Sequence, residues 1–292
     1  MMRIQMEMQK AQAEYVANPT PENMAIMQQK IAALTQESMR ISMQGASAAM
    51  AETYGQAGAE MYAQAIAGMM TDEDEEADEQ IKLDFVKANQ VPNDQEKYTL
   101  IGALLISTHD EPWQCFASMS DTGYWKEILK DGWDIKDISA GRKMLDSLLE
   151  GRHEKRFGDE FRKMKAGQPN KLDEESVEGY TETLEGLKEE VPSLFAPAQK
   201  CNTLVAWDLE RAGYLARIYF NLGWIDEAEL LDWLKKTATA IKAGFSVWED
   251  YFVSILIGRA VAYNFDYFMI GSIYDIFNEG QDILKKYPLS SL

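Results

Sequence analysis

The stretch Leu204-Val-Ala-Trp-Asp-Leu-Glu-Arg-Ala-Gly-Tyr-Leu-Ala-Arg-Ile-Tyr-Phe-Asn-Leu-Gly-Trp224 decides the fold. Its large apolar residues recur at intervals of three or four, so they share one face of a predicted helix. Gly213 disfavours this helix by about 1 kcal/mol relative to alanine, and a glycine here allows another helix to approach closely. Gly223 stands where a left-handed C-terminal cap is expected.

Charged side chains interrupt the apolar face. Arg211 follows Trp207 by one helical turn, so its guanidinium can cover the indole, an interaction worth roughly 0.5–1 kcal/mol. Asp208 precedes Arg211 by three residues, within reach of an ion pair. Two interpretations stay open. One is a structural cluster, because a buried arginine is usually paired; the other is an anion- or carboxylate-binding arginine held by Asp208.

Two further helices follow along the chain. Asp226 begins a capping box in the first, and Ser246 and Glu249 form a capping box in the second. Short connections at Gly223 and Gly244 make the three helices neighbours in space.

The carboxylates of Asp208 and Glu249 each stand beside a tryptophan at the start of a helix. If both face Arg211 and Arg259, the four charges balance and lock the helices together. If they line a cleft with His153, one carboxylate can act as acid or base. The predicted binding residues are the aromatic and cationic side chains of these segments, namely Trp133, Trp207, Arg211, Trp248 and Arg259.

Several of these segments carry a family resemblance. Residues 207–211, 223–229, 245–249 and 258–259, with the upstream residues 133–137 and 151–157, resemble domain-of-unknown-function family 1266, a group of uncharacterised bacterial proteins. The resemblance covers roughly residues 98–270. The family usually has Gly-His-Arg where this chain has Gly-Arg-His, which displaces His153 by one position. The resemblance implies no established activity.

Composition narrows the classes of function. The net charge of -19 argues against binding to nucleic acid or to an anionic membrane surface. Only two cysteines occur, and they do not form a C-x-x-C pair. We therefore expect a reducing compartment and no disulfide framework. The first ten residues lack an apolar signal core, and no apolar run reaches the length of a membrane span. We therefore expect a cytoplasmic protein.

The chain is expected to divide into three parts. Residues 1–70 form a helical arm rich in Met, Gln and Ala, residues 71–80 an acidic linker, and residues 81–292 a helical domain. The arm contains a short coiled-coil-like seam at Met24, Met27, Ile31, Leu34 and Ile41. It packs on its own domain or on a sister chain, which would make a homo-oligomer. A Met-rich binding surface and a membrane-active hairpin are the alternatives.

Four other segments give local expectations. Residues 98–107 and 121–130 are predicted to be helices, the second closed at residues 131–132. Residues 193–197 are predicted to be an extended connector, and residues 261–277 to be the most buried part of the tail.

Signatures of catalysis are missing from the sequence. There is no G-x-S-x-G, G-x-x-x-x-G-K-[ST], G-x-G-x-x-G or H-E-x-x-H motif, and the chain has two histidines. Glu150 and His153 have the Glu-x-x-His spacing of di-iron helices, but that motif has to occur twice. We predict no cofactor and no metal site.

These observations favour an all-α protein with a single multi-helix domain preceded by a helical, coiled-coil-like N-terminal arm. The function we favour is non-enzymatic binding of a protein partner with a basic surface, in the manner of an immunity or inhibitor protein. The alternative is an enzyme of unknown class whose pocket is lined by Asp208, Arg211, Glu249 and His153.

Overall fold

The computed structural model describes residues 72–278 and 280–292, and every regular element in these two ranges is a helix. The predicted all-α class is confirmed for this part of the chain. The predicted arm over residues 1–70, with its coiled-coil-like seam, lies outside the described residues. The chain divides after Gln80, and the candidate site belongs wholly to Ile81–Leu292, a single helical domain.

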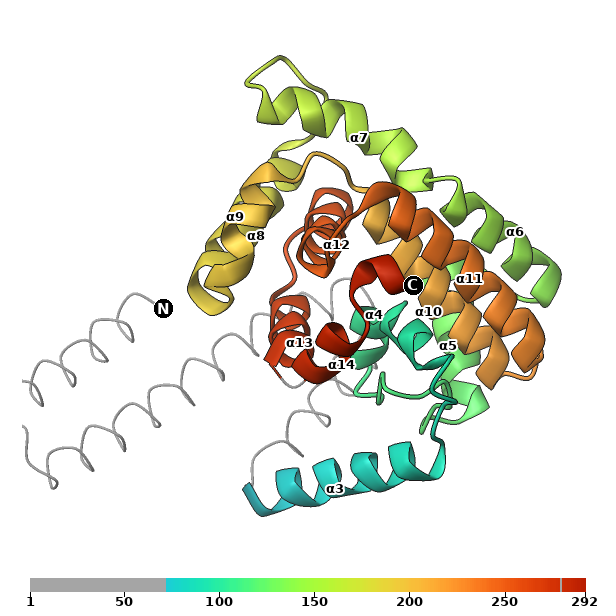
Figure 1. Ribbon diagram of the computed structural model, residues 1–292. Helices are drawn as coiled ribbons and strands as arrows, with labels where there is room; N and C mark the ends of the chain where they lie inside the picture. The colour runs from blue at the N-terminus through green and yellow to red at the C-terminus, as the bar shows by residue number, and fades with distance from the viewer. Residues whose placement is uncertain (1–71, 279) are drawn as a thin grey trace, which may run out of the picture. The chain divides into compact units, whose positions relative to one another are not determined.

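The helices are short to medium in length and follow one another closely (Figure 1). In chain order they are α3 (Asp72–Ala88), the 3₁₀ helix η1 (Glu96–Leu100), α4 (Ala103–Ser107), α5 (Thr122–Trp133), α6 (Ile138–Leu149), α7 (Arg152–Lys165), α8 (Glu174–Glu190), α9 (Pro192–Lys200), α10 (Val205–Asn221), α11 (Glu227–Gly244), α12 (Trp248–Tyr263), α13 (Tyr267–Asn278), α14 (Gln281–Lys286) and the 3₁₀ helix η2 (Leu289–Ser291). The acidic run predicted as a linker falls within α3.

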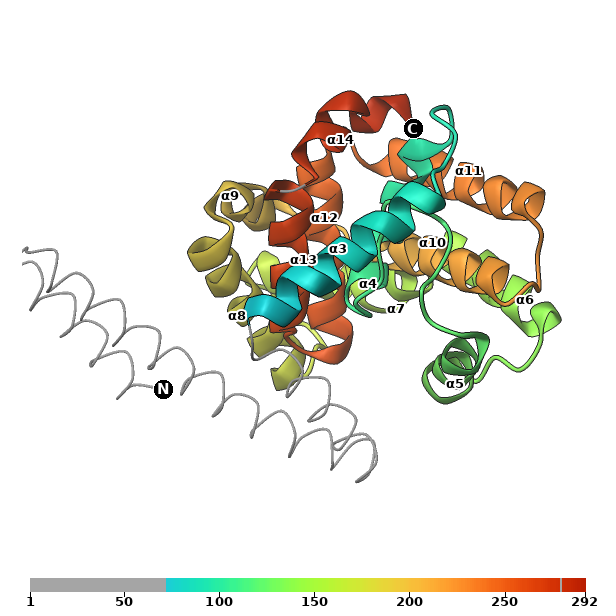
Figure 2. The same ribbon diagram turned by 90° about the horizontal axis from the view of Figure 1, so that it is seen from below.

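Helix α10 lies in the middle of the domain. It packs against α4, α6, α7, α11 and α12. On the far side of α12 lie α8 and α9, so α12 separates this pair from α10 in both views (Figures 1 and 2). Every residue of α10 from Ala206 to Tyr219 is buried. The prediction of one apolar face was therefore too narrow, because the helix is enclosed on all sides.

Aspartates begin several helices as the sequence indicates. Asp226 accepts a hydrogen bond from the backbone N–H of Glu229 at 2.8 Å, and Asp121 and Asp137 cap α5 and α6 in the same way. The predicted cap at Ser246 is wrong. Helix α12 begins one residue later than expected, with Val247 at the N-cap position and no side-chain cap.

A backbone contact divides the segment over residues 98–107, which was predicted as one helix. Gly102 has φ = 81°, so it interrupts the chain between η1 and α4. A Cβ on Gly102 would lie 2.5 Å from the backbone nitrogen of Tyr214, and one on Gly213 would lie 2.5 Å from Cγ2 of Ile101. The predicted close approach at Gly213 is therefore present, but the partner is this turn rather than a helix.

Two other local predictions are corrected. The connector expected over residues 193–197 is helix α9, because Pro192 occupies the first helical position, where a missing N–H costs nothing. Helix α5 runs past Gly132 and ends at Trp133, with Asp134 as a C-cap in the left-handed conformation. The tail prediction is not contradicted, although Tyr263 and Tyr274 are 54% and 49% exposed. Residues 261–277 contribute five residues to the core, namely Val261, Met269, Ile270, Ile273 and Ile276.

Replacing Gly102 by alanine should destabilise the domain by about 3 kcal/mol, combining left-handed strain with a backbone clash against α10. The matched control is Gly132→Ala in α5, where no heavy atom lies within 4 Å of the added Cβ. That control should raise stability by up to about 1 kcal/mol. Urea unfolding followed by circular dichroism measures both. Equal stabilities for the two variants would contradict the packing described here.

Candidate functional site

Four charged side chains on α10 are buried, although a buried charge is costly unless it is paired and hydrogen-bonded. Asp208 and Glu210 are fully buried, and Arg211 and Arg217 are 4% and 1% exposed. The two acids and two bases balance in charge. Each of the four contacts a different set of backbone groups, so the helix ties separate segments of the chain together.

Asp208 holds the start of α7. Its carboxylate accepts hydrogen bonds from the backbone N–H of His153 at 2.8 Å and of Glu154 at 3.1 Å. Helix N-termini carry unsatisfied N–H groups and a partial positive charge, so a carboxylate is a favourable partner there. Gly151, with φ = 74°, makes the turn that aims this helix start at α10.

Arg211 lies between two tryptophans and beside a histidine. Its guanidinium carbon is 4.8 Å from the ring centroid of Trp207 and 5.8 Å from that of Trp133. Nη2 of Arg211 donates a hydrogen bond to the Asp208 carboxylate at 2.6 Å, and Nε donates to the carbonyl of Trp207 at 3.1 Å. The predicted ion pair and cation–π contact are both present, and burial lowers the pKa of Arg211.

His153 completes this cluster. Nη2 of Arg211 lies 2.5 Å from Nδ1 of His153, whereas the Asp208 carboxylate lies 3.4 Å from this Nδ1. Because a guanidinium only donates, we assign Nδ1 as the acceptor and place the ring proton on Nε2. Burial lowers the pKa of His153, and the nearby charge of Asp208 opposes this, so the ring is neutral near neutral pH.

Glu210 holds the turn at Gly102. Its carboxylate accepts from the backbone N–H groups of Gly102 and Leu105, each at 3.1 Å, and from the hydroxyl of Tyr251 at 3.0 Å. Burial raises the pKa of Glu210, and these hydrogen bonds oppose the increase. The carboxylate thus fixes the close approach between α4 and α10.

Arg217 holds the segment that leads from η1 to α5. Its guanidinium donates to the carbonyls of Thr99 and Trp113, each at 3.1 Å, and to that of Cys115. Burial lowers the pKa of Arg217 to about 10, which still leaves it charged at neutral pH. Sequence reasoning missed Glu210 and Arg217. The signal was a helix whose uncharged residues are almost all apolar and whose charges cancel, which is typical of full burial.

His109 forms a second polar cluster near α10. Its Nδ1 lies 2.6 Å from the hydroxyl of Tyr124, and its Nε2 lies 2.8 Å from the hydroxyl of Tyr214. Burial lowers the pKa of His109 to about 4, and the charge of Glu111 opposes this. The imidazole is therefore neutral over the physiological range and acts as a bridge between two tyrosines.

The predicted four-charge arrangement is only half present. Asp208 and Arg211 meet, but Glu249 is exposed and makes no side-chain hydrogen bond or ion pair with any described residue. Arg259 donates to the carbonyl of Asn264 at 3.0 Å and pairs with Asp266 at 3.4 Å. Neither charge of α12 therefore pairs with Asp208 or Arg211, and no three-helix ionic lock forms.

The predicted tryptophans divide in the same way. Trp207 and Trp133 flank Arg211. Trp248 is buried elsewhere, where its Nε1 donates to the carbonyl of Tyr287 at 2.8 Å and secures the C-terminal segment. The alternative pocket lined jointly by Asp208, Arg211, Glu249 and His153 therefore loses Glu249.

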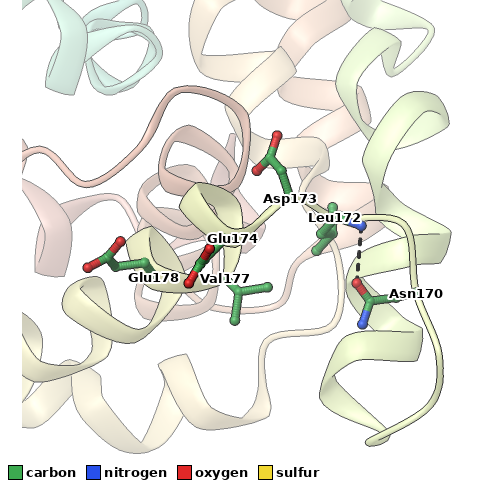
Figure 3. Close-up of a pocket in the computed structure, with 6 residues that line it drawn as sticks. All are labelled: Asn170, Leu172, Asp173, Glu174, Val177 and Glu178. Atoms are coloured by element: carbon green, nitrogen blue, oxygen red, sulfur yellow. Dashed lines mark hydrogen bonds between the residues drawn. The ribbon is translucent and has the colours of Figure 1, made fainter.

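A separate feature lies on the surface at the start of α8. A shallow hollow of about 500 Å³ is lined by Asn170, Leu172, Asp173, Glu174, Val177 and Glu178 (Figure 3). The charged groups of this lining are three carboxylates, without a basic side chain among them. The hollow is therefore an acidic depression at the exposed end of a helix.

Within residues 72–278 and 280–292, no three side chains of His, Cys, Asp or Glu converge as metal ligands do. No helix there combines the length and apolar character that crossing a bilayer requires.

Together the fold and the site define an all-α domain, over the residues that the structure describes, built around a buried, charge-balanced helix. The chain belongs to the family described as protein of unknown function (DUF1266), whose model matches residues 128–275. This confirms the resemblance, with a match that begins at Ile128 instead of residue 98. Comparisons with curated proteins and with solved structures gave no match.

Replacing Asp208 by alanine should destabilise the domain by about 3–5 kcal/mol, because it leaves Arg211 as a buried unpaired charge. The control is Asp232→Ala, which breaks an exposed pair with Lys236 and should cost at most about 0.5 kcal/mol. Denaturant unfolding compares the two. A loss below about 1 kcal/mol for Asp208→Ala would show that the cluster is not needed for folding.

His109 should make the domain less stable in mild acid. Its folded pKa of about 4 lies below the ordinary value of 6.5, so the unfolded chain binds the proton more tightly. The contribution of His109 is complete above about pH 6.5 and is lost as the pH falls toward about 4, with a loss of about 2 kcal/mol by pH 5. The slope of unfolding free energy against pH should be flatter in His109→Gln. An unchanged slope would mean that His109 titrates normally.

Proposed function

We propose that this protein binds a basic surface on a protein partner through the acidic face of α8, without a catalytic step. Residues 173–190 contain eight acidic side chains, Asp173, Glu174, Glu175, Glu178, Glu182, Glu185, Glu189 and Glu190, against one basic side chain, Lys188. All of these acidic residues are exposed. This concentration of one sign of charge is the observation that carries the proposal.

Most of these carboxylates have no partner of opposite charge. Among the described residues, no ion pair involves Glu174, Glu175, Glu178, Glu182, Glu185 or Glu189. Like charges one turn apart on a helix destabilise it by a few tenths of a kcal/mol per pair. A surface with many Lys and Arg residues would relieve this repulsion, and complementary charge also speeds encounter and selects the partner.

The acidic hollow supports the same proposal at the scale of one side chain. It lies at the first turn of α8, and Asp173, Glu174 and Glu178 belong to its lining (Figure 3). A lysine or arginine side chain from a partner would meet negative charge there. An inhibitor- or immunity-like protein, which masks a basic surface on another protein, is the concrete form we favour. An oligomer formed through residues 1–70 stays a separate prediction.

The test compares two triple variants with the same change in charge. Glu174, Glu178 and Glu182 are changed to glutamine on α8, and Glu127, Glu227 and Glu249 are changed to glutamine elsewhere on the exposed surface. Each full-length protein is used to capture partners from a lysate of cells that carry the gene. We expect a protein with a basic surface to be retained by the wild type and the control and lost from the α8 variant.

Salt gives a second criterion for the same experiment. Recovery should fall steeply as ionic strength rises, because exposed charges are screened within about 8–10 Å at physiological salt. Equal recovery by the two triple variants would contradict a binding role for α8. So would the absence of any retained basic protein.

A further inference from the structure

Three N–H donors around Arg211 have no acceptor within the described part of the chain. The indole Nε1 of Trp207 is buried and makes no hydrogen bond. Arg211 makes its hydrogen bonds through Nη2 and Nε, so Nη1 is left without an acceptor. The His153 ring contacts Arg211 and Asp208 through Nδ1, so Nε2 is left without an acceptor. All three side chains are more than nine-tenths buried.

The indole Nε1 of Trp207 is unusual, since most buried polar groups in proteins are hydrogen-bonded. Among these three donors, Nε1 of Trp207 is fully closed off from solvent, whereas Nη1 of Arg211 and Nε2 of His153 reach the surface. The nearby acceptor, Asp208, already takes hydrogen bonds from Arg211 and from two backbone N–H groups. A ligand at this place therefore has to supply acceptor oxygens.

Positive charge lies beside these donors, although the chain as a whole is acidic. Arg152 is exposed next to His153, and its charge lowers the pKa of both His153 and Arg211, after the larger effect of burial. Glu154 is turned toward Arg162 and the backbone of Leu204, and Glu150 is paired with Lys155. Neither carboxylate competes with an anion at the donors.

Aromatic rings border the same surface. Tyr263 is 54% exposed, and its ring centroid lies 5.6 Å from that of His153 and 6.2 Å from that of Trp207. Phe157 lies on His153 as well, with a centroid distance of 5.8 Å. These rings offer apolar contact to the body of a small molecule whose charged group meets the donors.

We propose that the surface between Tyr263 and Arg152 binds the oxyanion group, carboxylate or phosphate, of a small molecule. Nη1 of Arg211 and Nε2–H of His153 donate hydrogen bonds to the oxygens of this oxyanion group. Asp208 keeps the guanidinium in place, and Arg152 adds a favourable field. Charge-assisted hydrogen bonds from an arginine are among the strongest polar contacts in proteins, and the N–H groups of the one free terminal nitrogen suit either anion. This site is independent of the acidic face of α8.

The test is a titration of full-length protein with sodium phosphate and, separately, with sodium benzoate, in a zwitterionic buffer without chloride. The two histidines give two Hε1 signals in the NMR spectrum. We expect a saturable shift of the His153 signal. The His109 signal is an internal control, because both of its ring nitrogens are bonded to tyrosine hydroxyls and it should not move.

Three variants locate the site. Arg152→Gln should weaken binding roughly two- to fivefold, as expected from removing one charge several ångströms from the anion near the surface. Lys163→Gln removes the same charge from the far end of α7 and should leave the affinity unchanged. Arg211→Lys keeps the charge but removes Nη1, so it should abolish the saturable shift of the His153 signal. If it does not fold, the comparison of Arg152→Gln with Lys163→Gln decides.

The outcomes separate the two sources of the oxyanion. Saturation by phosphate alone points to a phosphorylated ligand, and saturation by benzoate alone or by both points to an aromatic or apolar carboxylate. No saturable shift of the His153 signal with either anion would overturn the proposal. Equal affinity in Arg152→Gln and Lys163→Gln would overturn it as well.

Discussion

The balance of charge inside α10 is the constraint on which the rest of the domain depends. Two carboxylates and two guanidinium groups are removed from water on one helix, which costs several kcal/mol per ion unless other groups replace the water. The carboxylates of Asp208 and Glu210 take backbone N–H groups at the starts of α7 and α4. Arg217 takes carbonyls from the segment before α5. The polar groups of connecting segments therefore replace solvent for the buried charges.

This arrangement explains why the upstream segment is part of the core. The family match begins at Ile128, yet Glu210 and Arg217 depend on Gly102, Leu105 and other residues before that point. Without those residues both charges would be left buried and unsatisfied. The domain that folds is accordingly longer than the matched region, and it includes η1, α4 and the chain between α4 and α5.

The buried charges and the surfaces for which we propose binding lie in different parts of the domain. The charges of α10 cancel and face inward, whereas those of α8 share one sign and face solvent. Helix α12 stands between these two helices (Figure 2). The surface at Tyr263 and Arg152 differs from both, because buried donors reach the exterior there beside a positive charge. A change on α8 should thus leave the core intact, while a change in Asp208 affects the whole domain.

The sequence predicts what is local and misses what is distant. Caps at Asp121, Asp137 and Asp226, and the pair Asp208–Arg211, follow from spacings of a few residues. The partners of Glu210 and Arg217 are backbone groups about a hundred residues away, and a backbone group has no identity in the sequence. Glu249 was placed wrongly because its position beside a tryptophan says nothing about the rotation of α12. The sequence alone does not indicate that Gly102 and Gly151 each separate two helices, because these breaks depend on the packing against α10.

Native-state amide hydrogen exchange tests the central claim most directly. First-turn amides normally exchange fast because they lack intrahelical acceptors. The amides of His153, Glu154 and Leu105 donate to buried carboxylates of α10. They should exchange with a free energy close to that of global unfolding, unlike the exposed first-turn amides of Glu174 and Glu175 in α8. Fast exchange at all five amides would contradict the account.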